Sequence, residues 1–196
     1  MKIITGTAKG KRLSTMEGDS VRPTSERIKE AMFSSIQFDI EGRRVLDLFA
    51  GSGQLGLEAL SRGAVSAMFI DADRDALAYA KENATRTGFF PICRFLVSDY
   101  RNYLRKAAGR EVFDLVFIDP PYGMCCCADA VRRLTEGHLL APGALLVLES
   151  GEEFPGDFPA GDPLFARFDL LKSTHYGKKT MLNILFYRGE EETPCE

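Results

Sequence analysis

The stretch Asp119-Pro120-Pro121-Tyr122 follows a buried apolar run and combines an acid, two prolines and an aromatic ring. The apolar run, residues 115–118, is typical of a strand inside a parallel sheet. Because proline lacks a backbone N–H and has a fixed φ, the two prolines end this strand and hold the backbone beside the acid. An acid held rigidly beside an aromatic ring can bind a flat ligand that carries an amino group.

The chemistry that suits these four residues is group transfer to an exocyclic amine of a nucleobase. Such an amine is a poor nucleophile, because its lone pair is delocalised into the ring. Asp119 and the carbonyl of Pro120 can each accept a hydrogen bond from one of its N–H groups, which moves the nitrogen toward tetrahedral geometry. Pro121 helps to fix the backbone, and stacking of the base on Tyr122 is worth about 1–3 kcal/mol. Transfer from an activated donor then needs mainly positioning.

Three glycines predict a nucleoside-cofactor site. Gly51, Gly53 and Gly56 lie in the segment 47–56 (DLFAGSGQLG), between a predicted strand and a predicted helix. Glycine at these positions lets the backbone turn tightly and approach a ligand closely. The pattern has little meaning alone, but here it has the strand–turn–helix context that nucleotide binding requires.

Two acids that follow the next two predicted strands belong to the same predicted site. Asp71 ends the second strand, where an acid can accept hydrogen bonds from both hydroxyls of a ribose. Asp99 follows the third strand, on the edge where ligands bind in a doubly wound sheet, and could accept from an adenine amino group. A helix cap is the alternative interpretation of Asp99, and Asp73 is expected to cap the helix that follows it.

These features fit either NAD or S-adenosylmethionine. NAD places a pyrophosphate at a helix N-terminus, whereas Asp47 places an acid beside the glycine loop, which suits a ligand with an ammonium and a sulfonium. The predicted C-terminal hairpin also departs from the all-parallel dinucleotide fold. Both observations favour S-adenosylmethionine. An NAD-dependent dehydrogenase and a non-catalytic RNA-binding module are the alternatives.

An alternation of strands and helices that begins at residue 43 positions these residues. Strands are predicted at residues 43–50, 64–73, 92–99, 112–119 and 143–150. Helices are predicted at residues 53–63, 74–88 and 128–137, with a helical turn at 100–109. The chain then forms a predicted antiparallel hairpin, residues 164–176 and 180–188. The alternation predicts an α/β fold with a mostly parallel seven-stranded sheet, right-handed crossovers and helices on both faces.

The N-terminal residues are predicted to form a basic arm. Residues 1–29 contain seven basic and three acidic residues, although the formal net charge of the chain is −3. A basic arm on an acidic body can dock phosphates locally. The arm is expected to be a β-hairpin, followed by a helix that Thr24 or Ser25 caps. We divide the chain into this arm, one domain and an acidic tail, at residues 1–22, 23–188 and 189–196.

The cysteine pattern and the apolar runs exclude several classes of protein. The five cysteines include three consecutive ones at 125–127, which fits neither a disulfide framework nor a zinc pattern, so no metal site is predicted. The N-terminal sequence has no signal-peptide pattern, and no apolar run approaches the roughly 20 residues that span a bilayer. We expect a reduced cytoplasmic protein with no membrane partner, present as a monomer.

Four segments together resemble the RsmD family of bacterial ribosomal RNA methyltransferases. They are ITGTAKGKRL, RPTSERIKEAMF, DLFAGSGQLGLEALSRG and FIDPPY. The resemblance covers about residues 1–187. It implies a Rossmann-like class I methyltransferase fold that uses S-adenosylmethionine to methylate guanine N2 at position 966 of 16S rRNA. The implied partner is 16S rRNA in the 30S ribosomal subunit or an assembly intermediate.

The resemblance also implies the site residues, with catalysis at Asp119, Pro120, Pro121 and Tyr122. The implied cofactor contacts are Asp47, Phe49, Ala50, Gly51, Ser52, Gly53, Asp71, Ala72, Asp99 and Tyr100. The implied RNA-binding residues are Lys9, Lys11, Arg12, Arg22, Thr24 and Arg27. Arg22 and Arg27 could instead be structural partners of acids at the edge of the core. A DNA methyltransferase acting on adenine N6 or cytosine N4 is a further alternative, because the catalytic residues suit any exocyclic amine; the compact chain favours RNA.

Overall fold

The structure is a computed structural model of the chain. It describes residues 1–15, 23–121, 123–124, 126–150, 162–176 and 180–189. Several residues named above lie outside the described residues: Arg22, Tyr122, Cys125 and most of the predicted tail, 190–196. The segment 151–161 and residues 177–179, between the two strands of the predicted hairpin, lie outside them as well.

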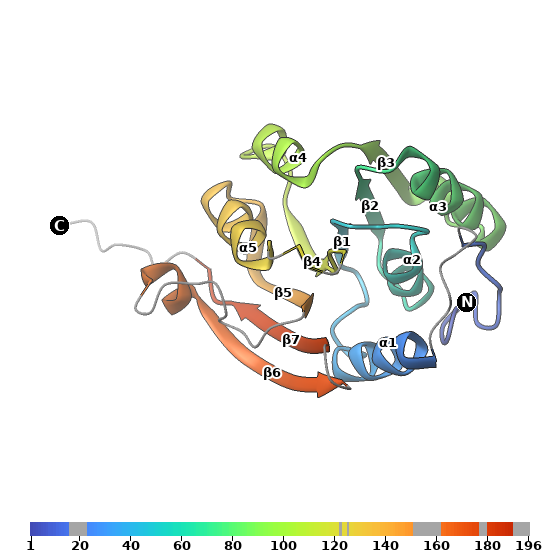
Figure 1. Cartoon of the computed structure of the whole chain (residues 1–196), viewed down its shortest axis with the longest axis horizontal. Coiled ribbons are helices and arrows are strands. Elements are labelled where there is room, and N and C mark those ends of the chain that lie inside the picture. The colour runs from blue at the N-terminus through green and yellow to red at the C-terminus, as the bar shows by residue number, and fades with distance from the viewer. Residues whose placement is uncertain (16–22, 122, 125, 151–161, 177–179, 190–196) are drawn as a thin grey trace.

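Seven strands form one sheet. They are β1 (Arg44–Asp47), β2 (Ser66–Asp71), β3 (Cys93–Val97), β4 (Phe113–Ile118), β5 (Leu140–Ser150), β6 (Phe168–Tyr176) and β7 (Thr180–Tyr187). Their order is β3-β2-β1-β4-β5-β7-β6, which can be followed across Figure 1. The pairs among β1 to β5 are parallel, whereas β7 runs antiparallel to both β5 and β6. The predicted parallel sheet with an antiparallel C-terminal hairpin is therefore confirmed.

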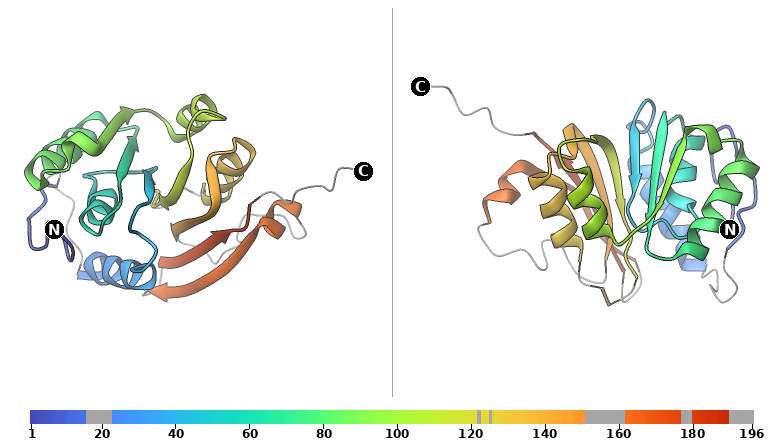
Figure 2. Two further views of the ribbon diagram at one scale, coloured as in Figure 1. Left: turned by 180° about the vertical axis from the view of Figure 1, so that it is seen from behind. Right: turned by 90° about the horizontal axis from the view of Figure 1, so that it is seen from above.

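Helices cover both faces of the sheet. The α-helices are α1 (Pro23–Ser35), α2 (Gln54–Ser61), α3 (Arg74–Thr87), α4 (Tyr100–Ala107) and α5 (Cys127–Glu136), and the short 3-10 helices are η1 (Phe90–Ile92) and η2 (Pro163–Arg167). Side chains of α1, α2 and α3 belong to one hydrophobic core, and those of α4 and α5 belong to the other. Figures 1 and 2 show these helix layers on opposite sides of the twisted sheet.

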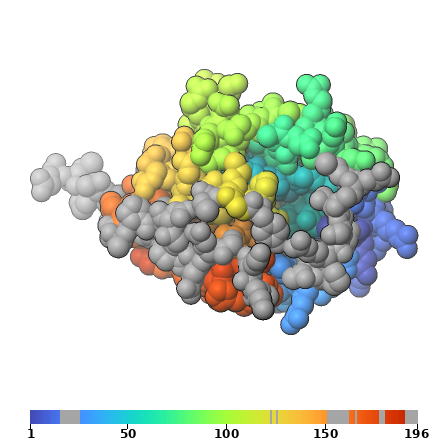
Figure 3. All heavy atoms as spheres, in the orientation of Figure 1, coloured from blue at the N-terminus to red at the C-terminus, as the bar shows by residue number. Residues whose placement is uncertain are grey.

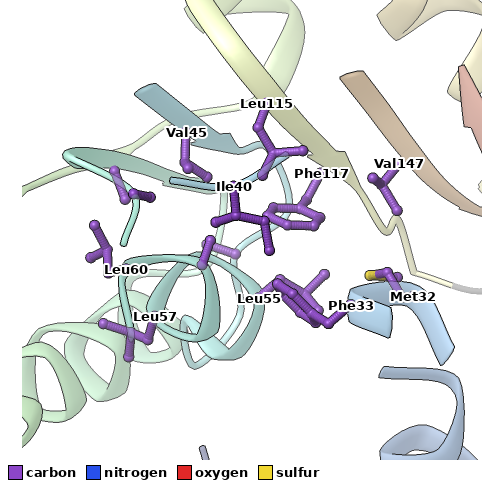
Figure 4. Close-up of a cluster of buried hydrophobic side chains, with 14 of the residues drawn as sticks. Met32, Phe33, Ile40, Val45, Leu55, Leu57, Leu60, Leu115, Phe117 and Val147 are labelled. Carbon is purple, nitrogen blue, oxygen red and sulfur yellow. The ribbon is translucent and has the colours of Figure 1, made fainter. Parts of the chain in front are cut away.

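Successive residues of β4 alternate between the two cores, as the period of a strand requires. Leu115 and Phe117 pack in the core with α1 and α2, and Val116 and Ile118 pack in the core with α4 and α5. Figure 4 shows Phe117 pointing toward Phe33 of α1, with ring centroids 5.5 Å apart. This alternation fixes the direction in which a residue directly after each strand must point.

The N-terminal arm folds back on itself and packs against α2. Lys2 and Arg12 form an antiparallel bridge, so the expected hairpin is present as one bridge and not as two regular strands. Ser61 of α2 donates through Oγ to the carbonyl of Thr5 at 2.6 Å. Gly6 has a φ of +88°, and a Cβ there would lie 1.7 Å from the Ser61 carbonyl oxygen. Only glycine allows the arm to approach the helix this closely.

A buried carboxylate joins the arm to two helices. Glu58 of α2 is fully buried and accepts hydrogen bonds from the backbone amides of Ile4 at 2.8 Å and Thr5 at 3.0 Å. The same carboxylate pairs with Lys29 of α1 at 3.1 Å and with Arg62 at 2.9 Å. Because the pair is buried and each oxygen is hydrogen-bonded, the carboxylate fixes the arm, α1 and α2 to one another.

Several predicted boundaries differ from the structure, and two of these differences have a clear local cause. The first helix begins at Pro23, before the two residues that are predicted to cap it. Proline is favoured at the first helical position because its fixed φ suits the helix and its missing N–H is not needed there. The sixth strand begins later than predicted, because the η2 turn precedes it. Asp162 starts this turn by accepting the amide of Leu164 at 3.0 Å.

Candidate active site

Four acids lie at the carboxyl ends of four neighbouring strands. Across the sheet they are Asp71 on β2, Asp47 on β1, Asp119 directly after β4 and Glu149 on β5. Two positions before each acid, the strand has a residue that packs in the core with α1, α2 and α3. These residues are Phe69, Val45, Phe117 and Val147. Since side chains two positions apart point to the same face, the four acids form one row on that face of the sheet. We call it the acidic row.

The glycine loop after β1 lies beside this row. The amide of Ala50 donates to the carbonyl of Ile70 at 2.9 Å, which holds the loop against β2. Gly51 and Gly53 have φ values of +52° and +81°, and Gly53 caps α2. A Cβ added to Gly51 would meet nothing within 4 Å. The loop therefore needs its glycines for the turn and is open at Gly51, where a ligand could approach the backbone.

Other residues of the glycine loop make contacts within the protein. A Cβ at Gly56 would lie 2.4 Å from the ring of Phe69, so the third glycine of the pattern serves the close packing of α2 on the sheet. The Ser52 carbonyl accepts from Asn83 Nδ2 at 3.0 Å. Sequence reasoning missed Asn83, a buried polar residue in the middle of α3.

Asp71 holds the glycine loop directly. One carboxylate oxygen accepts from the Gly51 amide at 2.7 Å, and the other accepts from the Asp73 amide at 2.9 Å. Each oxygen has further lone pairs, so the carboxylate can accept additional donors from a ligand. Ala72 is exposed beside it. Asp73 caps α3 by accepting from the Asp75 amide at 2.8 Å, as predicted.

Asp99 and Tyr100 stand at the start of α4. Asp99 caps this helix, accepting from the Arg101 amide at 2.9 Å, which is the alternative that the sequence left open. The Tyr100 ring is buried against Phe49 of the glycine loop, with centroids 5.2 Å apart. Its hydroxyl donates to Asp129 of α5 at 2.7 Å. Tyr100 thus connects the glycine loop to the helix that follows the predicted catalytic segment.

The predicted catalytic segment begins at the acidic row. Asp119 and Pro120 are half-buried and Pro121 is exposed, and the Pro121 carbonyl accepts from the Met124 amide at 3.1 Å. Tyr122 lies outside the described residues. Sequence reasoning missed Glu149, although an acid at the end of a predicted strand was the signal that identified the other members of the row.

Burial raises the pKa values of three acids of the row, and neighbouring charges add to the rise for two of them. Burial raises the pKa of Asp119 well above its ordinary value, and the charges of Glu149 and Asp47 add to the rise. Burial also raises the pKa of Glu149. The pKa of Asp47 is raised to about 7, mainly by burial and also by the charge of Asp71, against a hydrogen bond from the Gly56 amide. A cationic ligand would relieve this repulsion, whereas an anionic one would increase it.

The raised pKa of Asp47 predicts that its carboxylate destabilises the ligand-free protein at neutral pH. Below about pH 4 the folded and unfolded chains both hold the proton; between about pH 4 and 7 only the folded chain holds it. The stabilisation from this proton is therefore lost as pH rises through the folded pKa. Between pH 4 and 8, wild type should therefore lose a few kcal/mol of unfolding free energy relative to Asp47→Asn. Urea unfolding at both pH values measures it, with exposed Asp39→Asn as control; parallel pH curves would contradict the assignment.

The predicted RNA-binding residues are spread over the arm and α1. Three of them, Lys9, Arg12 and Arg27, have exposed side chains. Their charged groups make no contact within the part of the chain that the structure describes. Lys11 instead donates through Nζ to the carbonyls of Arg86 at 3.2 Å and Thr87 at 3.1 Å, at the end of α3. Thr24 lies in α1. In Figure 3 the blue arm and α1 lie on one side of this view, and the orange-red C-terminal strands lie on the other.

The described residues form neither a metal site nor a membrane-spanning helix. No group of three or more His, Cys, Asp and Glu side chains there could hold a metal ion. None of the described helices has the length and apolar character to cross a membrane.

The strand order, the parallel sheet closed by an antiparallel hairpin, and the glycine loop after β1 define the Rossmann-like fold of class I methyltransferases. The chain belongs to the family described as "Conserved hypothetical protein 95", whose model matches residues 1–184. This is the RsmD family that the sequence motifs resemble.

Individual relatives agree with this assignment. The "Putative rRNA methyltransferase YlbH" of Bacillus subtilis is 35% identical over 168 residues, which cover 85% of this chain and 91% of the relative. The "Ribosomal RNA small subunit methyltransferase D" of Haemophilus influenzae is 32% identical, over 79% of this chain and 81% of the relative. The solved structure "Putative methyltransferase yhhF from Escherichia coli" has a TM-score of 0.83 at 29% identity, over 97% of this chain and 99% of that one.

Proposed function

We propose that this protein transfers a methyl group from S-adenosylmethionine to the exocyclic N2 amine of a guanine in 16S rRNA of the small ribosomal subunit. The observation that carries the proposal is the position of Asp119, at the end of β4 and in the same acidic row as the residues beside the glycine loop. The relatives named as ribosomal RNA small subunit methyltransferases support the rRNA substrate.

The residues beside the glycine loop fit the proposed methyl donor. The loop is open at Gly51, so its backbone can lie against a ligand. Asp71, hydrogen-bonded to the Gly51 amide, would accept from ribose hydroxyls, and Asp99 would face the adenine. The buried Tyr100 supports Phe49 of the loop. Asp47 and its neighbours in the row favour the ammonium and the sulfonium and disfavour the pyrophosphate of NAD. The charge of the row is therefore the reason to prefer S-adenosylmethionine over NAD.

The chemistry of transfer divides between the donor and the protein. S-adenosylmethionine supplies a methyl carbon whose bond to sulfur breaks, with its electrons leaving on sulfur, as the bond to the amine nitrogen forms. Asp119 and the Pro120 carbonyl would each accept a hydrogen bond from one N–H group of the amine. These two bonds would direct the lone pair of the nitrogen toward the methyl group. The methylated nitrogen then carries one proton too many, and Asp119 or water accepts it.

The test is methyl transfer to its proposed substrate. The purified protein is incubated with labelled S-adenosylmethionine and small-subunit particles from a strain that lacks the corresponding enzyme, and the modified base is mapped. We expect one methyl group per particle, on a guanine N2. Free 16S rRNA and protein-bound particles are compared in parallel. Absence of label in both would contradict the proposal.

The DNA methyltransferase remains the second candidate, because Asp119 and its prolines suit any exocyclic amine. The same assay with duplex and single-stranded DNA separates the two, since transfer to adenine N6 or cytosine N4 at a rate above that for rRNA would favour DNA. Calorimetry with S-adenosylmethionine and NAD tests the cofactor, and preferential binding of NAD would overturn the methyltransferase.

A further inference from the structure

Glu149 of β5 lies next to Asp119, the residue that directly follows β4. In the parallel pairing of β4 with β5, Phe117 stands opposite Val147 and Ile118 stands opposite Leu148. The next position in this register brings Asp119 opposite Glu149, and adjacent strands lie only about 4.8 Å apart. Because Phe117 and Val147 both pack toward α1 and α2, the two acids two positions later point to the same side.

Asp119 and Glu149 differ from the other two acids of the row, Asp47 and Asp71, in their contacts. Asp47 accepts the Gly56 amide, and Asp71 accepts two amides of the loops. Within the part of the chain that the structure describes, no donor is hydrogen-bonded to the carboxyl group of Asp119 or of Glu149. Two adjacent acceptors without described donors are suited to a ligand that presents two adjacent N–H groups.

Among the bases with an exocyclic amine, guanine presents that pattern. Its N2 amine stands next to the N1–H, so both neighbouring groups donate. In adenine the N6 amine stands next to N1, and in cytosine the N4 amine stands next to N3; both of these ring nitrogens are acceptors without a proton. A carboxylate opposite such a nitrogen would leave two acceptors facing each other, and unpaired buried polar groups are costly.

We propose that Glu149 selects guanine by accepting the N1–H of the target base while Asp119 accepts from the N2 amine. The proposal rests on the proposed function, and it assigns the choice of base to a residue outside the Asp119–Tyr122 segment. Glu149 does not take part in the transfer itself. Its role is recognition, so its loss should change which base is methylated as well as the rate.

The test compares two target bases with wild type, two variants of Glu149 and one control variant. Small-subunit particles are reconstituted from ligated 16S rRNA that carries either guanosine or the 2-aminopurine riboside at the mapped position. 2-Aminopurine keeps the amine but lacks O6 and has an unprotonated N1. The proteins are wild type, Glu149→Gln and Glu149→Asp, and the readout is kcat/KM for methyl transfer. Glu136→Gln, an exposed change on α5, is the control for loss of one negative charge.

The expected result is a loss of selectivity in one variant only. Glu149→Gln should lower kcat/KM on guanine about 10- to 100-fold, the value of a hydrogen bond to a charged group, and should change the rate on 2-aminopurine much less, because an amide can donate to its N1. Glu149→Asp keeps the charge and should keep the preference for guanine. Equal losses on both bases with Glu149→Gln, or equal wild-type rates on the two bases, would overturn the role of Glu149 alone. No wild-type transfer to guanine would overturn the proposed function and this inference with it.

Discussion

Replacing Asp119 with asparagine is expected to lower the rate of methyl transfer about 100- to 10,000-fold, the range that a positioned acceptor or base contributes. Asparagine has nearly the same shape, but its carbonyl is a weaker acceptor for the amine and cannot take up the proton. The raised pKa of Asp119 makes the natural carboxylate a stronger proton acceptor than an exposed one. The affinity for S-adenosylmethionine should change little, because Asp47 and Asp71 remain beside the glycine loop.

Two measurements separate this prediction from general damage. Single-turnover transfer to rRNA gives the chemical step, and calorimetry gives the affinity for S-adenosylmethionine. Asp114→Asn is the matched control, since it neutralises an acid at the opposite end of the same strand. Asp114 pairs with Arg44 at 2.8 Å, a partly exposed pair worth about 1 kcal/mol or less. If Asp119→Asn and Asp114→Asn transferred methyl groups at the same rate, the catalytic assignment would be wrong.

The parts of the site that the sequence predicted are those with a local signal. Gly51 and Gly53 follow a strand and precede a helix, so their pattern of turn residues was recognisable, and the prolines after Asp119 marked the end of β4. The parallel pairing of the first five strands follows from strand–helix alternation with right-handed crossovers. These features depend on residues close together in the chain, which is why periodicity and turn chemistry were sufficient.

The parts that the sequence did not predict depend on long-range register. Glu149 was part of a buried strand in the sequence, and its role is visible only when β5 is aligned with β4. The family resemblance implies that Lys11 binds RNA, and the structure shows that its ammonium donates to the carbonyls of residues 86 and 87, far away in the sequence. Charge gives the chemistry of a side chain but not its partner. The partner has to come from the tertiary structure.

Glu58 is the clearest such case, and it leads to the second large effect. It lies in the apolar helix segment 54–61, where an acid could have been solvent-exposed. Instead it is fully buried between Lys29, which is 3% exposed, and Arg62, which is 10% exposed. Burial lowers the pKa of Lys29, and the charge of Glu58 opposes that change. Removing the carboxylate would leave two buried cations without their common partner.

We expect Glu58→Ala to lower the free energy of unfolding by about 3–5 kcal/mol, the cost of breaking a buried ion pair by removing one partner. The backbone amides of Ile4 and Thr5 would lose their acceptor as well, which adds to the cost because unpaired buried donors are unfavourable. Urea unfolding of the two proteins measures the difference. Limited proteolysis should also cut the arm faster in the variant, since the carboxylate is a main contact between the arm and α2.

The chain contains a control with the same helical spacing. Glu82 pairs with Arg86 four residues later, as Glu58 pairs with Arg62, but both Glu82 and Arg86 are about half exposed. Exposed pairs of this kind contribute about 0.3–0.5 kcal/mol, so Glu82→Ala should change the free energy of unfolding by less than about 1 kcal/mol. Equal effects of the two substitutions would show that burial of Glu58 does not control the attachment of the arm. A large effect of Glu58→Ala alone would mean that the position of the basic arm depends on one carboxylate inside the domain.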